Sequence, residues 1–373
     1  MLITNKTINL NMEKMVGIIP IKEWEIYKQA PLLITGPCSA ETEEQLYAAA
    51  NELIKYNRVD VFRAGIWKPR TRPDTFEGVG REGLKWLRNI KRDLGLPIAT
   101  EVANQYHVNE ALKFGVDVLW IGARTSANPF SLQEIADALQ GVDVTVLIKN
   151  PITPDLDLWI GAIERIYKAG VRNVAAIHRG FSSYEKSRYR NQPIFQLPIE
   201  LKRAIPEISL ICDPSHIGGS REYIYELSQK SMDLNYDGLM IESHCNPDMA
   251  LSDSKQQVTP ADLDTILTRI TLRQPDTDNP VYKDVIAELR SRIDQYDDQL
   301  LDLLETRMNT AETIGKYKRE NNITILQSNR WEQIINKAVG KGKDKGLSEE
   351  FICKVFEALH QESINHQNQV MNS

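Results

Sequence analysis

One short segment gathers cations that could bind an anionic substrate. Residues 62–80 read FRAGIWKPRTRPDTFEGVG and place Arg63, Lys68, Arg70 and Arg72 within ten residues. Glycine and proline interrupt the segment, so it cannot form a solvated helix face. Arginine offers a planar fork to phosphate or carboxylate, and lysine offers a point charge. The loop predicts a site for a substrate with several negative charges, and an exposed basic turn is the alternative.

A second set of residues has the chemistry of a metal site. Cys38, His216 and Glu242 stand at or just after the ends of short apolar runs, and Asp253 lies in the segment ALSDSKQQ. A thiolate, an imidazole and two carboxylates suit a divalent transition metal such as Mn, Fe, Co or Zn. Taken singly, a cysteine is more often a buried apolar residue and a histidine a turn residue. The metal prediction therefore depends on a fold that brings the four together.

Eight apolar runs with β-forming residues supply such a fold. They occupy residues 32–35, 59–63, 98–102, 116–121, 144–149, 173–178, 208–212 and 238–242. Amphipathic helical stretches alternate with them, at 41–56, 82–94, 106–114, 130–139, 156–169, 221–234 and 261–272. Eight strands that alternate with helices in this way predict an α/β fold, a (β/α)8 TIM barrel, which usually takes ~250 residues. A doubly wound open sheet is the runner-up.

Polar or reactive residues follow every one of these runs. In a barrel the carboxyl ends of the strands share one rim, which is where active sites of this fold lie. The first, seventh and eighth strands become neighbours on closure, so the four metal-donor candidates would meet there. The same rim would collect six cations, Arg63, Lys68, Arg70, Arg124, Lys149 and Arg179. That number suits two phosphorylated substrates, or one substrate with a phosphate and a carboxylate.

Composition narrows the class of protein. The 373 residues are 42% hydrophobic and carry a net charge of −6, with neither half strongly basic. We therefore expect no nucleic-acid arm and no membrane-binding surface. The N-terminal residues lack an apolar targeting segment, which predicts a cytoplasmic protein. The four cysteines are widely spaced, so free thiols or a metal ligand are expected rather than disulfides.

The last hundred residues change in character. Residues 1–30 are an N-terminal extension and 31–272 the barrel, and the polar, proline-containing segment 273–280 predicts a linker. Residues 281–320 contain no proline, and their apolar positions recur every three or four residues, which indicates one long helix. Further helices are expected at 329–339 and 348–368, separated by a loop at GKGKDKG. A helical module of about one hundred residues cannot cover the long helix by itself. We therefore expect a second copy of the chain to pair with it in a dimer.

The rim motifs carry a family resemblance. GPCSAE at 36–41, FRAGIWKPRTRP at 62–73, GAR at 122–124, IKNP at 148–151, HRG at 178–180, CDPSH at 212–216, MIESH at 240–244 and ALSD at 250–253 resemble 3-deoxy-D-arabino-heptulosonate 7-phosphate (DAHP) synthase. The resemblance covers residues 31–272 and is to the short type I enzymes of the beta subgroup. It implies a metal-dependent condensation of phosphoenolpyruvate with erythrose 4-phosphate. Because only about thirty residues precede the barrel, we expect no N-terminal ferredoxin-like domain.

The resemblance also implies residue roles. It assigns phosphoenolpyruvate to Arg63, Lys68, Ala123, Arg124, Lys149 and Arg179, erythrose 4-phosphate to Pro69, Arg70 and Thr71, and the metal to Cys38, His216, Glu242 and Asp253. Lys149 is a candidate proton donor, and Glu101 could orient the water that adds to C2. The related 3-deoxy-manno-octulosonate 8-phosphate synthases are the alternative. They resemble KANR where this chain reads Lys68 to Thr71, and the Pro-Arg pair here favours the four-carbon sugar.

The helical part resembles a second family. ELRSRID at 288–294, LLETR at 303–307, GKYK at 315–318 and the Ser363/Gln367 pair are similar to the all-helical chorismate mutases over 281–370. The resemblance implies an intertwined dimer of three-helix chains that rearranges chorismate to prephenate. Its site would use Arg290, Arg307, Lys318, Arg330, Ser363 and Gln367, with Lys318 and Gln367 stabilising charge on the ether oxygen.

Two departures leave an alternative for the helical part. Gln327 stands where an aspartate is common in that family, and Trp331 where a glutamate is usual. The module could therefore be a sensor without catalysis. As an enzyme or as a sensor, an end-product domain joined to a synthase predicts feedback inhibition of the synthase by prephenate or chorismate.

Overall fold

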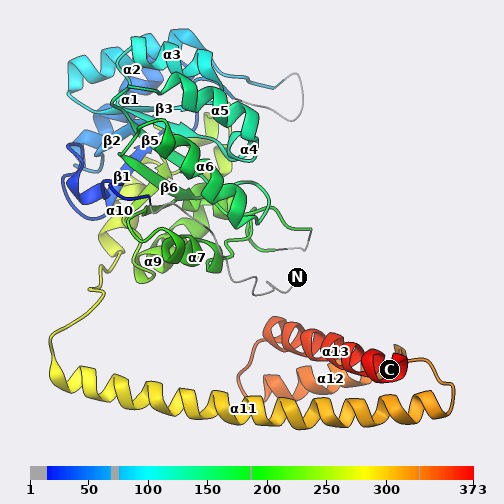
Figure 1. Ribbon diagram of the computed structural model, residues 1–373. Helices are drawn as coiled ribbons and strands as arrows, with labels where there is room; N and C mark the ends of the chain where they lie inside the picture. The colour runs from blue at the N-terminus through cyan, green and yellow to red at the C-terminus, as the bar shows by residue number, and fades with distance from the viewer. Residues whose placement is uncertain (1–14, 69–74, 185–186, 327) are drawn as a thin grey trace. The chain divides into compact units, whose positions relative to one another are not determined.

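The computed structural model describes residues 15–68, 75–184, 187–326 and 328–373. The described chain forms two compact units, one ending at Pro275 and one comprising Asp276–Ser373 (Figure 1). Each unit has its own layers and is considered separately. Among the described residues, no helix is both long enough and apolar enough to cross a membrane.

The first unit is built on a closed parallel barrel. Among the described residues its strands are β1 (Leu32–Gly36), β2 (Val61–Arg63), β3 (Ile98–Val102), β4 (Val118–Ile121), β5 (Thr145–Lys149), β6 (Val174–His178), β7 (Ser209–Cys212) and β8 (Gly238–Glu242). Each strand pairs with the next along the chain, and β8 returns to β1 with Gly36 opposite Glu242. The barrel prediction is confirmed, and the open sheet is excluded because an open sheet would leave β1 and β8 unpaired.

Helices follow the strands along the chain. They are α1 (Glu43–Lys55), α2 (Arg81–Leu94), α3 (Gln105–Lys113), α4 (Ala123–Ser126), α5 (Pro129–Ala138), α6 (Leu156–Lys168), α7 (Gln196–Ala204), α8 (Pro214–Gly218), α9 (Ile224–Asp233) and α10 (Pro260–Arg269). Short 3-10 turns add η1 (Ile21–Glu23), η2 (Arg221–Tyr223), η3 (Pro247–Met249) and η4 (Ser254–Gln256). Side-chain caps begin several helices, among them Thr42 before α1, Asp155 before α6 and Thr259 before α10.

Two apolar layers hold the barrel together. The larger layer lies between the strands and the surrounding helices, and the smaller one fills the barrel interior with residues such as Ile34, Trp120 and Met240. Ile21 and Trp24 belong to this inner layer, so the segment around η1 packs against the interior of the barrel. Ile21 N–H donates to Ser209 Oγ at 3.0 Å, which fixes η1 to the start of β7.

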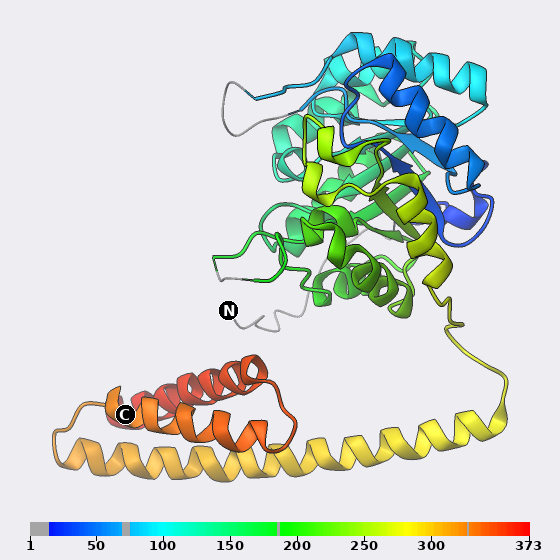
Figure 2. The same cartoon turned by 180° about the vertical axis from the view of Figure 1, so that it is seen from behind.

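The second unit is all-helical. It consists of α11 (Pro280–Glu320), α12 (Ser328–Lys343) and α13 (Glu349–Asn372), and α13 packs against both α11 and α12 (Figure 2). The helix predicted at 281–320 is confirmed. The loop predicted at GKGKDKG is wrong in part, because α12 continues to Lys343. A Cβ at Gly342 would lie 2.5 Å from Ile352 Cγ1, so this glycine permits close packing of two helices rather than a turn.

The first half of α11 exposes an apolar stripe. Val285, Leu289, Ile293, Tyr296 and Leu300 recur at helical spacing, and each is between 44% and 57% exposed. Within the described part of this unit, α12 and α13 fold back beside the second half of α11 (Figures 1 and 2). An apolar stripe of this length is typical of a surface that another helix covers.

Candidate active sites

The metal-donor candidates lie at the junction of β1, β7 and β8. Cys38 follows β1, Glu242 ends β8, and His216 lies on the short helix α8 directly after β7. Asp253 lies in the loop after β8, with a left-handed backbone at φ 47°. The prediction that these residues meet depended on barrel closure, which the β1–β8 pairing provides.

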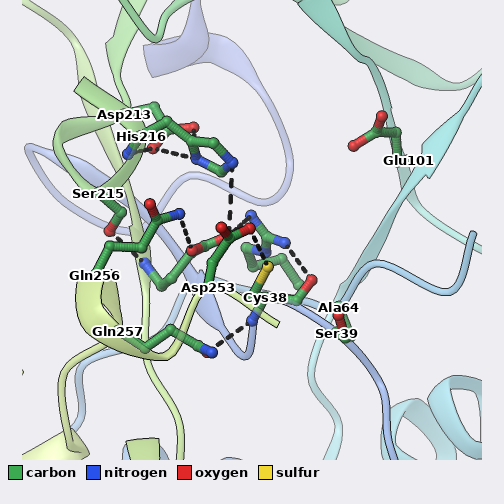
Figure 3. Close-up of polar contacts among 12 residues, drawn as sticks. Cys38, Ser39, Ala64, Glu101, Asp213, Ser215, His216, Asp253, Gln256 and Gln257 are labelled. Carbon is green, nitrogen blue, oxygen red and sulfur yellow. Dashed lines mark hydrogen bonds and ion pairs between the residues drawn. The ribbon is translucent and has the colours of Figure 1, made fainter. Parts of the chain in front are cut away.

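The four donor groups approach one another in two pairs. Cys38 Sγ lies 3.5 Å from Asp253 Oδ2, and His216 Nε2 lies 3.9 Å from Glu242 Oε1 (Figure 3). Two ligands of one tetrahedral ion stand about 3.5 Å apart, given bonds of roughly 2.0–2.3 Å. No group of three or more His, Cys, Asp or Glu side chains among the described residues is assembled closely enough to hold a metal ion.

The chemistry of the donors nevertheless fits a metal ion. Glu242 Oε1 is fully buried and has no hydrogen-bond partner among the described residues, although Arg63 Nη1 lies 3.4 Å away. Burial alone would raise the pKa of Glu242, but His216 and Arg63 outweigh it and lower this pKa. Burial raises the pKa of the Cys38 thiol to about 11, with Glu242 adding to the effect. A buried carboxylate oxygen beside an imidazole nitrogen and a sulfur is a donor set for a transition metal.

Several polar residues that sequence reasoning did not single out hold these donors in place. Gln256 Nε2 donates to Glu242 Oε2 at 2.7 Å, and Ser215 Oγ accepts from the Glu242 backbone N–H at 3.0 Å. Arg190 donates to Asp253 Oδ1 and to Gln256 Oε1, both at 2.9 Å. Arg190 comes from the loop after β6, and only the folded barrel brings that loop to Asp253.

Two predicted phosphoenolpyruvate ligands lie against the metal-donor group. Arg63 is buried, donates from Nη2 to Cys38 O at 3.0 Å and stacks over the Trp120 ring at 4.5 Å. Lys68 donates to the same carbonyl oxygen, and its Nζ lies 3.1 Å from Cys38 Sγ. The structure therefore places Arg63 and Lys68, two cations of the predicted anion site, beside Cys38, a predicted metal ligand.

Lys149 and Arg179 lie further around the rim. Lys149 is buried and donates from Nζ to Asp213 Oδ2 at 2.8 Å. Arg179 donates to Asn191 Oδ1 at 2.9 Å, and its backbone N–H donates to Asn150 Oδ1 at 2.7 Å. Burial lowers the pKa of Arg179, with the positive charges of Arg190 and then Arg124 adding to the effect. Several cations that influence one another on the same rim favour a site for negative charge.

Asp213 carries a strongly stabilised negative charge in this region. Burial opposes its ionisation, but His216 and Lys149 outweigh burial and hold the pKa of this carboxyl well below its usual range. Asp213 therefore lies ionised between a predicted metal ligand and a predicted substrate ligand.

Glu101 and the GAR segment lie at the ends of β3 and β4. Glu101 Oε2 accepts from Trp120 Nε1 at 2.9 Å, which fixes the carboxylate on the rim away from His216 (Figure 3). A Cβ at Gly122 would lie 2.3 Å from Glu101 Oε1, so the glycine leaves room for this carboxylate. Ala123 and Arg124 open the short helix α4, with Arg124 exposed. Pro69, Arg70 and Thr71, predicted for the sugar phosphate, lie outside the described residues.

The helical unit gathers part of its predicted site. Arg307 on α11 donates to Ser363 Oγ on α13, and its Nη1 lies 3.1 Å from Leu359 O. Gln367, one turn after Ser363, is buried, and its Oε1 has no hydrogen-bond partner among the described residues. Burial lowers the pKa of Arg307. Arg307 and Ser363 thus form a polar contact between α11 and α13, and the unpaired amide oxygen of Gln367 is a buried acceptor on α13 that a ligand can satisfy.

The other predicted residues of this unit are more dispersed. Lys318 donates to Ile325 O at 2.6 Å. Arg330 is exposed and contacts Gln333 at 3.3 Å, while Arg290 is exposed on the first half of α11. Trp331 stacks on His360 with ring centroids 4.3 Å apart, a contact that sequence reasoning missed. Gln327 lies outside the described residues.

Comparisons with known families cover both units. The model of the DAHP synthetase I family matches residues 21–274, and the model of chorismate mutase type II matches residues 289–368. These ranges fall on the barrel and on the helical unit respectively.

Individual relatives resemble the barrel. Phospho-2-dehydro-3-deoxyheptonate aldolase of Thermotoga maritima is 31% identical over 226 residues, which are 61% of this chain and 64% of that protein. A 2-dehydro-3-deoxyphosphooctonate aldolase of Geobacter metallireducens is 29% identical and covers 64% of this chain and 90% of its own. The crystal structure of the Thermotoga maritima DAHP synthase superposes with a TM-score of 0.58 at 28% identity, over 64% of this chain and 67% of that chain.

Proposed function

This chain belongs to the DAHP synthetase I family, and we propose that its barrel condenses phosphoenolpyruvate with D-erythrose 4-phosphate to give DAHP and phosphate. The observation that carries the proposal is the junction of two sub-sites on one rim. Lys68 Nζ lies 3.1 Å from Cys38 Sγ, so an anion held by the cations lies beside the metal-donor group. An aldol-like condensation needs its nucleophile and its polarised aldehyde held together in this way.

Phosphoenolpyruvate is bound, in this proposal, by Arg63, Lys68, Ala123, Arg124, Lys149 and Arg179. Arg63 and Lys149 are buried, and a buried cation binds an anion more strongly because water screens the pair less. Pro69, Arg70 and Thr71 are assigned to the phosphate of the sugar. Charge-assisted hydrogen bonds from arginine and lysine would fix both anions in near-attack geometry.

Cys38, His216, Glu242 and Asp253 would hold a divalent Mn, Fe, Co or Zn ion. Such an ion supplies Lewis acidity that polarises an aldehyde. The chain's own residues supply the proton chemistry. Lys149, held by Asp213 at 2.8 Å, can donate a proton from Nζ, and Glu101, held by Trp120, can orient the water that adds to C2 of phosphoenolpyruvate.

The choice of sugar phosphate is the direct test of this proposal. With phosphoenolpyruvate and a divalent metal, we expect phosphate release with erythrose 4-phosphate at a kcat/KM at least about a hundred-fold above that for a five-carbon aldose phosphate, a difference of roughly 2.7 kcal/mol in transition-state binding. The octulosonate aldolases that resemble this barrel make the five-carbon substrate the relevant competitor. Preference for the five-carbon sugar would assign the barrel to octulosonate 8-phosphate synthesis instead.

We further propose that the helical unit rearranges chorismate to prephenate. The match to chorismate mutase type II and the contact between Arg307 and Ser363 support this activity. The reaction needs no covalent step, so the site has only to hold a dicarboxylate in a compact conformation and stabilise charge on the ether oxygen. Arg307 and Arg330 would bind carboxylates, with Ser363 beside them, and Lys318 and Gln367 would face the ether oxygen. A sensor without catalysis is the second candidate, favoured by Trp331 in place of an acidic residue.

The active form of this unit is proposed to be a homodimer. The exposed stripe of α11 from Val285 to Leu300 supports it, because an intertwined second copy would bury these side chains. Arg290 lies on the same half of α11, so the dimer would carry this residue to the partner's site. Both activities are proposed to take place in the cytoplasm, consistent with the free thiols of all four cysteines.

Prephenate is proposed as the feedback inhibitor of the synthase. Deleting residues 273–373 should leave a barrel that retains synthase activity but loses inhibition by prephenate, because the effector site is removed while the rim is kept. Synthase rates measured against prephenate concentration for the full and shortened chains check this. Equal inhibition of the two would place the effector site in the barrel and refute the proposal.

A further inference from the structure

One buried carboxylate joins the two sub-sites of the barrel. Asp213 directly follows β7 and is fully buried, and its oxygens contact Lys149 on one side and His216 on the other. We infer that Asp213 is a positioning residue that fixes the His216 ring for metal binding and holds Lys149 toward phosphoenolpyruvate at the same time. This inference rests on the proposed synthase function for the role of Lys149, but its metal-binding half does not.

The contacts of Asp213 define its orientation. Oδ1 accepts from the His216 backbone N–H at 3.1 Å, which caps the short helix α8. His216 Nδ1 lies 3.0 Å from Oδ1 and 2.8 Å from Oδ2, and Lys149 Nζ lies 2.8 Å from Oδ2. The Asp213 backbone N–H donates to His178 O at 2.8 Å, which ties the residue to β6. With the backbone and both carboxylate oxygens engaged, Asp213 has little freedom to rotate.

These contacts determine the tautomer of His216. Oδ2 accepts from Lys149 Nζ and Oδ1 from the His216 backbone N–H, so both oxygens are acceptors, Nδ1 must carry the hydrogen, and Nε2 has the free lone pair. Nε2 is the nitrogen that faces Glu242 Oε1, at 3.9 Å. A carboxylate that accepts from one ring nitrogen while the other faces the metal is a recurrent support for metal-binding histidines. Asp213 therefore presents the correct nitrogen to the metal-donor group.

The charge of Asp213 also stabilises Lys149. Lys149 is buried, and a buried ammonium group without a counter-charge is strongly unfavourable. Asp213 is the carboxylate that contacts its Nζ in the described structure. One carboxylate thus sets the position of a group in each sub-site, so its removal must affect both metal and substrate binding.

Replacement of Asp213 by asparagine tests the inference. When the asparagine oxygen accepts from Lys149, the amide NH2 faces His216 Nδ1. The ring would have to accept there and carry its hydrogen on Nε2, the nitrogen needed for the metal. With the amide oxygen on Lys149, the NH2 group takes the place of Oδ1 and cannot accept from the His216 backbone N–H, so this variant also weakens the cap of α8. The nitrogen-15 shifts of His216 in the wild type, where the cap is intact, test the tautomer separately.

Cobalt binding is the readout that does not depend on turnover. In Co²⁺ titrations of metal-free full-length protein, followed by thiolate-to-cobalt absorption, we expect Asp213→Asn to weaken affinity about ten- to hundred-fold. The KM for phosphoenolpyruvate should rise in the same variant. Asp60→Asn is the matched control, because Asp60 is also buried but accepts from Leu33 N–H near the start of β1. Its Co²⁺ affinity should be unchanged.

The results of these measurements either support or overturn the positioning role of Asp213. Wild-type Co²⁺ affinity in Asp213→Asn would overturn the inference. Loss of affinity in both variants would also overturn it, since a general structural effect would then explain the result. If Asp213→Asn does not fold, the nitrogen-15 shifts of His216 in metal-free wild type replace it, and a hydrogen on Nε2 would overturn the inference. A chain that binds Co²⁺ in this Asp213-dependent manner but forms no DAHP would refute the proposed synthase and leave the metal-binding half of the inference standing.

Discussion

Replacing Cys38 by alanine should reduce metal-dependent synthase activity by about a thousand-fold or more. Cys38 is the sulfur donor of the proposed metal site and lies 3.5 Å from Asp253 Oδ2. Loss of a Lewis acid removes several kcal/mol of transition-state stabilisation, and each 1.36 kcal/mol corresponds to a factor of ten in rate. Activity should not return at saturating substrate, because the cations that bind phosphoenolpyruvate are unchanged and the polarisation of the aldehyde is what is lost.

A matched control separates this effect from the loss of a buried sulfur. Cys212 on β7 is as deeply buried as Cys38 and lies in the core between strands and helices. Both alanine substitutions create a small cavity and should lower the free energy of unfolding by a similar amount, about 1 kcal/mol. Only Cys38→Ala should lower the bound metal content and kcat. Full activity of Cys38→Ala with undiminished metal would remove Cys38 from the proposed ligands.

The rim was predictable from sequence because strand ends are local features. An apolar run followed by polar residues marks where a strand stops, and the barrel rule then places all such ends on one face. Pairing of Gly36 with Glu242 follows from barrel closure, so the approach of Cys38 to the β8 end could be expected.

The supporting contacts were not predictable in the same way. Arg190, in the loop after β6, reaches Asp253 only because the loops after β6 and β8 fold over the same rim. Gln256 reaches Glu242 because the loop after β8 turns back over the end of its own strand. Asp213 lies within the motif CDPSH, but its partner Lys149 is 64 residues away along the chain. Hydrogen-bond partners of this kind depend on loop conformation, which residue type and spacing do not determine.

In the helical unit, too, local features were predictable from the sequence and contacts between helices were not. The 3.6-residue period of α11 predicted a long helix and an uncovered face, because periodicity reports which side of a helix is apolar. The extent of α12 differs from the prediction because Gly342, in a segment with the composition of a loop, permits close contact of the helix with Ile352. The stack of Trp331 on His360 joins α12 and α13, and no pattern in the sequence near either residue predicts this contact.

Replacing Lys318 by alanine should lower the rate of chorismate loss about a hundred- to thousand-fold. The proposed rearrangement develops negative charge on the ether oxygen, and removal of one preorganised donor to such an oxygen typically costs 10²–10³ in kcat. In the described structure Lys318 Nζ donates to Ile325 O, so its side chain already points toward the segment between α11 and α12. The decrease in chorismate absorbance with purified full-length protein measures the effect, and synthase activity in the same sample should be retained.

Lys316→Ala is the control that separates the loss of a specific hydrogen-bond donor from the loss of one positive charge on α11. Lys316 lies two residues earlier on the same helix, is exposed, and carries the same charge. Because residues two apart on a helix point in different directions, its loss should leave chorismate turnover within about two-fold of wild type. Equal losses in both variants would mean that the net charge of α11, rather than a donor at the ether oxygen, controls the rate. No chorismate turnover by the wild type, with the synthase intact, would instead make the unit a sensor. In that case Lys318→Ala should weaken prephenate inhibition of the synthase, because the same cation would then contribute only to binding the effector.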